Sequence, residues 1–128
     1  MAKRAITTPK GKAIGPYSLA IESGDSVFIS GQIPLDAATG KLVEGDVSAQ
    51  AKQSLENLKA ILDAAGLTFG HAVKTTIFLT SMADFAAVNE VYKSYMSEPY
   101  PARSTIAVAA LPMGAKVEIE MIASRSAI

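Results

Sequence analysis

The segment from Pro99 to Met121 (PYPARSTIAVAALPMGAKVEIEM) constrains the fold most, because its prolines exclude a helix and hold the chain extended. Pro99 and Pro101 fix their own φ angles and drive the residues before them toward extended conformations. The small and β-branched residues from Thr105 to Leu111 then predict a buried strand. The sequence Pro112-Met113-Gly114 is typical of a turn and ends that strand.

A second strand follows this turn, because apolar and polar residues alternate from Lys116 to Ser124, which is the period of a half-buried strand. Glu118 lies on the polar side of the alternation, and Arg103 comes just before the apolar run of the first strand. If the two strands pair, the arginine and the glutamate lie near each other. The sequence therefore predicts a candidate site in which a cation lies beside a carboxylate.

The rest of the chain is assigned from periodicity, caps and turn signals. The expected elements are a polar arm or loop over 1–16, a strand over 17–22, a hairpin turn at 23–25, a strand over 26–30 followed directly by Gly31, a loop over 32–46, a helix from 46 or 48 to Gly66, a strand over 73–80, and a helix that starts near 81–84 and is broken by Pro99.

This order of elements predicts a single sheet with only two helices, which can cover one face of it. The strands nevertheless carry apolar residues on both faces, as when Phe28 alternates with Val27 and Ile29, or Phe78 with Ile77 and Leu79. The second face therefore needs a cover that this chain does not contain. A homo-oligomer packed sheet to sheet is the simplest cover.

Charge balance and the lack of cysteine exclude several classes of function. The 128 residues include 12 Lys and Arg and 12 Asp and Glu, so the net charge is zero. A net charge of zero favours neither nucleic acid nor cationic partners. Without cysteine, disulfides and thiolate chemistry are excluded.

The length and the 49% apolar content predict one domain over residues 1–128. The N-terminus lacks the apolar core of a secretory signal, and no run has the length of a membrane span, so a cytoplasmic protein is expected.

Several motifs together resemble one known family. They are GPYS at 15–18, SGQIP at 30–34, QSLENLKAIL at 53–62, KTTIFL at 74–79, and PARS with VEIE within 101–120. In this order they resemble the RidA/YjgF family of reactive-intermediate (enamine/imine) deaminases, also described as the L-PSP endoribonuclease family. The resemblance runs over nearly the whole chain.

The resemblance implies a fold and an activity. The fold would be α+β and chorismate-mutase-like, with a mixed sheet, two helices on one face, and trimerisation through the other face. A homotrimer would hold its sites in clefts between subunits. The activity would be hydrolysis of 2-aminoacrylate-type enamines, as their 2-imino acid tautomers, to 2-oxo acids and ammonia. Pyridoxal-phosphate enzymes release such intermediates, and no metal or organic cofactor is expected for their hydrolysis.

The resemblance also assigns roles to individual residues. Arg103 would hold the substrate carboxylate, which its planar fork suits better than lysine does. Glu118 would position the hydrolytic water or move a proton. The other residues expected at the substrate are Tyr17, Ser30, Gly31, Asn89 and the backbone around Thr105. Two positions depart from many members, because Thr105 stands where cysteine is common and Ala110 where a basic residue is common.

Other interpretations stay open. A non-catalytic module that binds a small carboxylate would use Arg103 equally well, and Glu118 favours the enzyme only modestly. An endoribonuclease or translation inhibitor would need paired acid and base groups and a basic track. The chain offers one histidine, His71, without metal-ligand companions, and a short basic arm over residues 3–12. Without the resemblance, Glu118 would be interpreted as the solvated face of a strand.

Overall fold

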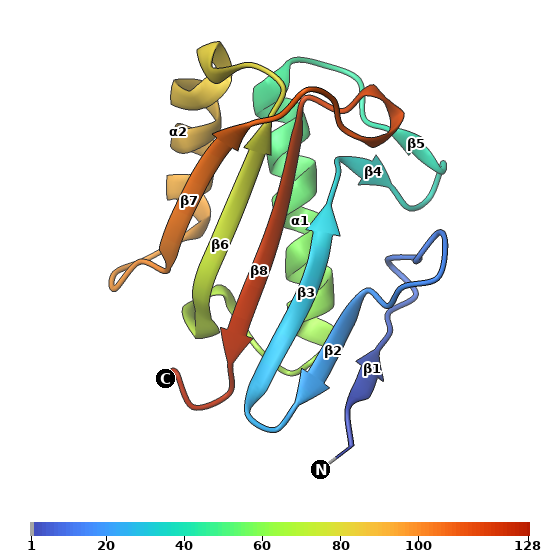
Figure 1. Cartoon of the computed structure of the whole chain (residues 1–128), viewed down its shortest axis with the longest axis vertical. Coiled ribbons are helices and arrows are strands. Elements are labelled where there is room, and N and C mark those ends of the chain that lie inside the picture. The colour runs from blue at the N-terminus through green and yellow to red at the C-terminus, as the bar shows by residue number, and fades with distance from the viewer. Residues whose placement is uncertain (1) are drawn as a thin grey trace.

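The structure, a computed structural model, describes residues 2–128 and is built on a six-stranded sheet (Figure 1). In spatial order the strands are β1 (Arg4–Ile6), β2 (Ala20–Ser23), β3 (Ser26–Gln32), β8 (Val117–Ser124), β6 (Ala72–Leu79) and β7 (Ala102–Ala107). Neighbours are antiparallel except for β6 and β7, which run parallel. The sheet is therefore mixed, as the resemblance implied.

Two helices, α1 (Val47–Ala64) and α2 (Phe85–Tyr95), lie on one face of this sheet, behind it in Figure 1. A two-stranded ribbon of β4 (Leu35–Asp36) and β5 (Lys41–Leu42) lies beside them. Three short 3₁₀ turns complete the chain, at Phe69–His71, Met82–Asp84 and Pro112–Gly114. No helix within residues 2–128 combines the length and the apolar character needed to cross a bilayer.

Helix α1 forms where the sequence predicted it, because its start, its stop and its apolar spacing agree. The side chain of Asp46 accepts a hydrogen bond from the Ala49 N–H at 3.0 Å, which caps the first turn. Gly66 follows the last turn with a φ of +75°, a value that glycine adopts without strain. Leu55, Leu58 and Leu62 are fully buried on the side that faces the sheet.

The two faces of the sheet differ sharply in burial. The side chains that point toward the helices form the core and are buried, and they include Val27, Ile29, Ile77, Leu79, Val117, Ile119 and Met121. On the opposite face, Phe28 remains 47% exposed and Ile106 46% exposed. The prediction that two helices cover one face and leave the other open is confirmed for the single chain.

The predicted pairing of the two C-terminal strands is wrong. Strand β7 pairs only with β6, and β8 lies between β3 and β6, so β6 separates the two. The apolar run from Thr105 to Leu111 is not a buried strand either: β7 covers residues 102–107 and lies at the edge of the sheet, where most of its side chains are exposed. The local pattern showed an extended segment, whereas its neighbours were decided by the whole topology.

Smaller corrections concern the N-terminal half. The strand predicted over 17–22 begins only at Ala20, so Tyr17 lies in the segment before it. The arm over 1–16 contributes the edge strand β1, and the loop over 32–46 contains β4 and β5. These strands have two or three residues each, too few for the alternation of side chains to be visible in the sequence.

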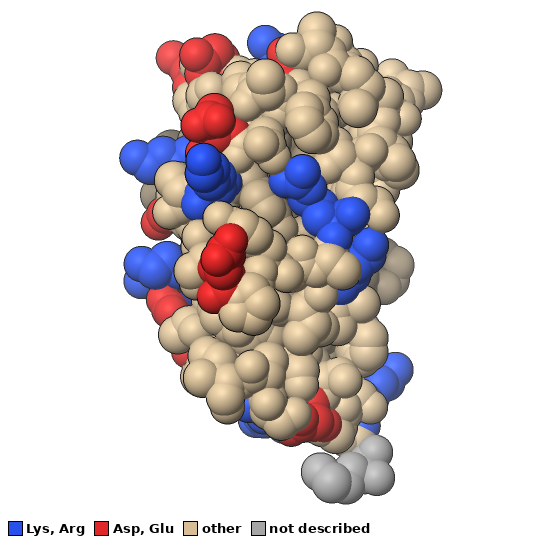
Figure 2. Space-filling model, turned by 90° about the vertical axis from the view of Figure 1, so that its left-hand side faces the viewer, with Lys and Arg blue, Asp and Glu red and all other residues tan. Residues whose placement is uncertain are grey.

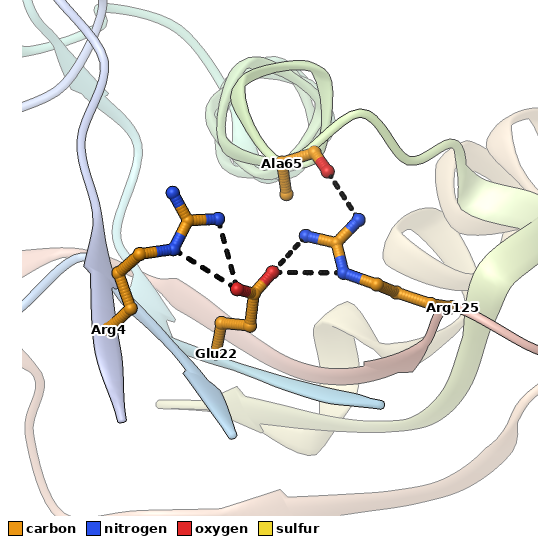
Figure 3. Close-up of polar contacts among 4 residues, drawn as sticks. All are labelled: Arg4, Glu22, Ala65 and Arg125. Carbon is orange, nitrogen blue, oxygen red and sulfur yellow. Dashed lines mark hydrogen bonds and ion pairs between the residues drawn. The ribbon is translucent and has the colours of Figure 1, made fainter. Parts of the chain in front are cut away.

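An ionic cluster ties both ends of the chain to the helix side of the sheet (Figure 3). Arg4 donates from Nε and Nη2 to Oε2 of Glu22, at 3.1 and 3.0 Å. Arg125 pairs with the other oxygen of Glu22 and donates from Nη1 to the carbonyl of Ala65 at 2.8 Å, just past the end of α1. Hydrogen bonds from Arg125 and then from Arg4 lower the pKa of Glu22.

We predict that Glu22→Gln lowers the urea midpoint at pH 7 and reduces the loss of stability in acid. Because the pKa of Glu22 is lower in the folded state, its contribution is present above the unfolded pKa and is lost as the pH falls through the folded pKa. The difference between wild type and variant should therefore shrink toward zero in strong acid. Urea unfolding at a series of pH values measures this. Glu44→Gln, an exposed carboxylate without an ion pair in residues 2–128, is the control.

Candidate functional site

Arg103 and Glu118 lie on opposite faces of the sheet. In the parallel pairing, Arg103 is opposite Thr75, whose side chain is buried on the helix side. In the antiparallel pairing, Glu118 is opposite Phe78, which alternates with the buried Ile77 and so points to the open side. The predicted proximity of the arginine and the glutamate is thus wrong within one chain. The structure instead contains two separate half-sites.

Helix α2 presents one face to Arg103. Asn89 accepts a hydrogen bond from Nη1 of Arg103 at 2.7 Å. The guanidinium carbon lies 5.0 Å from the ring centroid of Tyr92 and 5.7 Å from that of Phe85, so the cation stacks on two aromatic rings. Residues 85, 89 and 92 recur at helical spacing and therefore share this face. The predicted site residue Asn89 is thus in direct contact with Arg103.

The first half-site is a cleft of about 430 Å³ beside Arg103. Its lining residues are Asn89, Tyr92, Lys93, Tyr100, Pro101 and Arg103. No carboxylate in the described part of the chain forms an ion pair with Arg103. Its charge is therefore available to an external anion, and a guanidinium binds a carboxylate with two parallel hydrogen bonds.

The second half-site is a cleft of about 460 Å³ around Glu118. Tyr17, Ser30 and Gly31 line it together with an apolar wall that includes Ile14 and Met113. The Ile14 N–H donates to the hydroxyl of Tyr17 at 3.3 Å, and the hydroxyl of Ser30 donates to the carbonyl of Ser18 at 2.7 Å. Three of the predicted site residues are thereby grouped around the predicted glutamate.

Gly31 lies in close contact with the carboxyl group of Glu118. A Cβ atom built on Gly31 would lie 2.8 Å from Cδ of Glu118, closer than such atoms approach in proteins. The absence of a side chain therefore lets the carboxyl group rest against the strand β3. A larger residue after Ser30 would push this carboxyl group away from the strand.

The carboxyl group of Glu118 has an unusual electrostatic environment. It makes no hydrogen bond or ion pair with any residue in the range 2–128. Burial raises its pKa, and repulsion from the neighbouring Glu120 raises it further. A half-buried carboxylate without a partner and with a raised pKa is suited to exchange protons with a bound molecule.

Thr105 offers backbone groups at the sheet edge and a hydroxyl without a partner. The Val108 N–H donates to the carbonyl of Leu79 at 2.8 Å, toward β6. Since backbone groups alternate in direction along a strand, those of Thr105 point away from β6 and are free at the edge. Its Oγ1 atom is buried and has no hydrogen-bond partner among the described residues. The backbone role expected here is compatible with this geometry.

Two residues beside Arg103 were missed. Phe85 and Tyr92 are not among the predicted site residues, although their helical spacing with Asn89 is visible in the sequence. The polar Asn89 within that apolar stripe is the signal that could have marked this helix face as part of a site.

His71 lies in a 3₁₀ turn, where its Nδ1 accepts a hydrogen bond from the Thr68 N–H at 3.1 Å. It therefore acts as a cap, away from both half-sites.

The face seen in Figure 2 carries charges of both signs. Seen from the side of α2 and β7, basic and acidic side chains both occur, some of them in contact, and one group of Lys and Arg side chains forms a short diagonal band (Figure 2). Among residues 2–128, no group of three His, Cys, Asp or Glu side chains is placed to hold a metal ion.

Comparison with known proteins gives a consistent result. The family described as "Endoribonuclease L-PSP" matches residues 7–125. A 2-iminobutanoate/2-iminopropanoate deaminase of Salmonella typhimurium is 51% identical over 98% of this chain and 99% of its own. The crystal structure of RidA from an Antarctic Psychrobacter has a TM-score of 0.91 and 48% identity, covering 94% of this chain and 98% of its own. That of Escherichia coli TdcF with bound serine has a TM-score of 0.90 and 47% identity, covering 96% and 99%.

We predict that Glu118→Gln raises or preserves stability at pH 7. Because the folded state raises the pKa of Glu118, the folded protein binds this proton more tightly than the unfolded chain. Stability is then lost as the pH rises from the unfolded pKa to the folded pKa, and a neutral glutamine avoids this loss.

Urea unfolding of wild type and Glu118→Gln between acidic and neutral pH measures the effect. Glu120→Gln is the matched control: it removes the repulsion that Glu118 feels but leaves the Glu118 carboxyl in place, so it should give only part of the gain. A Glu118→Gln protein that is clearly less stable than wild type at pH 7 would contradict the assignment.

Proposed function

The chain belongs to the RidA/YjgF family, which is also described as "Endoribonuclease L-PSP". We therefore propose that it is a 2-iminobutanoate/2-iminopropanoate deaminase. It is a hydrolase that acts on C=N bonds. The observation that carries the proposal is the identity of about half of all residues, over nearly the full length, to deaminases of that name. The substrates are small 2-imino acids, and the serine bound by TdcF, also a small carboxylate with an adjacent nitrogen, supports this class.

The reaction adds water across a C=N bond and releases ammonia. The water oxygen bonds to C2 while the C=N electron pair moves to nitrogen, which takes up a proton. The C–N bond of this adduct then breaks, ammonia leaves, and the oxygen loses its proton to become the 2-oxo group. The substrate carbon is already electrophilic, so the protein has to hold the carboxylate, place the water and move protons.

We propose that Arg103 holds the substrate carboxylate and Glu118 serves the water. Arg103 has no acidic partner and is oriented by Asn89, which leaves the rest of its fork for two parallel hydrogen bonds. Glu118 takes a proton from water and returns it to the leaving nitrogen. Burial raises its pKa, so it binds this proton more firmly than an exposed glutamate does.

The remaining predicted residues complete the proposed site. Tyr17 and Ser30 line the cleft around Glu118, and Gly31 leaves room for its carboxyl group. The free edge at Thr105 offers backbone groups to the nitrogen or the water. We expect no metal or organic cofactor in this reaction.

We further propose that the site forms between two copies of the chain, in a homotrimer. The two half-sites lie on opposite faces of one sheet, so a small substrate cannot touch Arg103 and Glu118 of the same chain. The exposed Phe28 and Ile106 on the uncovered face support an interface there. Residues 1–128 would act as one domain, in the cytoplasm.

Two other functions compete with this proposal. A non-catalytic module that binds small carboxylates would need the cleft at Arg103 but would not need Glu118. The endoribonuclease of the family description would need acid and base groups at a phosphate-binding surface. The mixed charges in Figure 2 and the capping role of His71 do not favour it.

We predict that Arg103→Lys lowers kcat/KM by about 10- to 100-fold, because lysine cannot form the two parallel bonds of the fork. A serine or threonine dehydratase generates the imine, and 2-oxo acid formation is followed with and without the protein. Arg4→Lys, which changes an arginine far from the site, is the matched control and should keep wild-type activity.

Near-wild-type turnover by Arg103→Lys would show that the carboxylate is held elsewhere. If the folded wild type does not accelerate imine hydrolysis at all, the deaminase proposal fails and the carboxylate-binding module takes its place.

We also predict that two inactive variants restore each other. Arg103→Ala and Glu118→Gln are each unfolded, mixed in equal amounts and refolded together. If each site takes Arg103 from one chain and Glu118 from a neighbour, about a quarter of the sites in random oligomers are intact. Activity near that fraction is expected from the mixture, against none from either variant refolded alone. A mixture as inactive as its components would contradict a site between chains.

A further inference from the structure

The guanidinium of Arg103 is held by a second layer of residues that links α2 to the sheet. The ring of Tyr92 lies under the cation, and its hydroxyl shares a hydrogen bond of 2.7 Å with the hydroxyl of Thr75. Thr75 is also the residue opposite Arg103 in the pairing of β6 with β7. Each of the three residues therefore contacts the other two: Thr75 is the strand neighbour of Arg103, Tyr92 hydrogen-bonds to Thr75, and Arg103 stacks on Tyr92.

This arrangement is rigid for physical reasons. Tyr92 is only 4% exposed and Thr75 is fully buried, so neither side chain can turn into solvent. A buried hydroxyl that loses its partner is penalised by about 1–3 kcal/mol, which keeps both hydroxyls in their shared bond. The ring of Tyr92 is thereby fixed in the plane on which the exposed arginine stacks. An unsupported arginine would lose the freedom of several rotatable bonds on binding.

The hydrogen-bond and stacking partners of Arg103 within residues 2–128 are uncharged. Asn89, Phe85 and Tyr92 orient the guanidinium without neutralising it, and burial raises the pKa of Tyr92, which keeps its phenol protonated. In contrast, Arg4 and Arg125 are both paired with Glu22. Arg4 and Arg125 therefore stabilise the fold through ion pairs, whereas Arg103 is held in position with its charge available.

We propose that Tyr92, locked by Thr75, is a positioning residue that pre-orients Arg103 for the carboxylate of the substrate. The role rests on the proposed function only for its link to turnover, because orientation of a carboxylate-binding arginine can be measured without any reaction. Pre-orientation lowers the entropy lost on binding, so it acts on KM and on the affinity for carboxylates rather than on the proton transfers.

The test uses three variants and one matched control. Tyr92→Leu removes the ring, whereas Tyr92→Phe and Thr75→Val keep the ring and remove the hydrogen bond that fixes it. The control is Tyr95→Phe, on the same helix, which removes the 2.6 Å hydrogen bond from Tyr95 to Glu56 and lies outside both half-sites. For each protein we would measure the Tm, kcat and KM for imine hydrolysis, and the Kd for 2-oxobutanoate as the carboxylate probe.

The expected result is an ordered loss of binding. Tyr92→Leu should raise KM and the Kd of 2-oxobutanoate by about 2- to 30-fold, the range of a cation–π contact. Tyr92→Phe and Thr75→Val should raise them less, and Tyr95→Phe should not, while kcat stays within about twofold. The NMR signal of the Arg103 Nε–H should also shift in the three variants and not in the control, because it reports on the ring beside it.

Two results would overturn the positioning role. The first is that Tyr92→Phe and Tyr92→Leu do not differ from the control Tyr95→Phe in KM, in Kd or in the Nε–H signal of Arg103. The other is a loss of kcat alone. The two proposals can fail separately. If the Kd values of wild type and variants for 2-oxobutanoate follow the expected order but the wild type does not hydrolyse imines, the positioning role stands and the deaminase proposal fails.

Discussion

The coverage of one sheet face by two helices determines the rest of this structure. All large buried side chains of β3, β6 and β8 point toward α1 and α2, and this one-sided core stabilises the chain. Because side chains alternate along a strand, each residue is assigned to the closed or the open face by its position alone. Arg103 falls on the helix side and Glu118 on the open side. The two residues therefore line different clefts.

Three arginines illustrate how one side chain serves two purposes. Arg4 and Arg125 share the carboxylate of Glu22 and so join the N-terminal strand, the C-terminal segment and the end of α1 (Figure 3). Arg103 hydrogen-bonds to Asn89 and stacks on Phe85 and Tyr92, which orient it without compensating its charge. Pairing lowers the pKa of Glu22, whereas burial without a partner raises that of Glu118. The ionic groups therefore divide into a paired cluster that stabilises the fold and two groups, Arg103 and Glu118, that form no ion pair within residues 2–128.

Much of the fold could be predicted from the sequence, because it is recorded in local patterns. The bounds of α1, the existence of α2, the strands β3, β6 and β8, and the exposed apolar face follow from periodicity, caps and glycine positions within short windows. Helix α2 itself is shorter than predicted, because Met82–Asp84 forms a 3₁₀ turn before it and Met96 is already extended. The short strands β1, β4 and β5 were missed because two or three residues carry no periodic signal. The resemblance to a family identified Arg103 and Asn89 at one cleft and Tyr17, Ser30, Gly31 and Glu118 at the other, but not Tyr92.

By itself, the sequence determined which residue types occur and on which side of its own element each one lies. Only the tertiary structure decided which elements are neighbours, and with them that Arg103 and Glu118 are separated by β6 and that Tyr92 supports the arginine. The physical reason is that strand order depends on the free energy of the whole core, to which residues far apart in the chain contribute. A local pattern fixes a direction for each side chain, and the partner it meets is a global property.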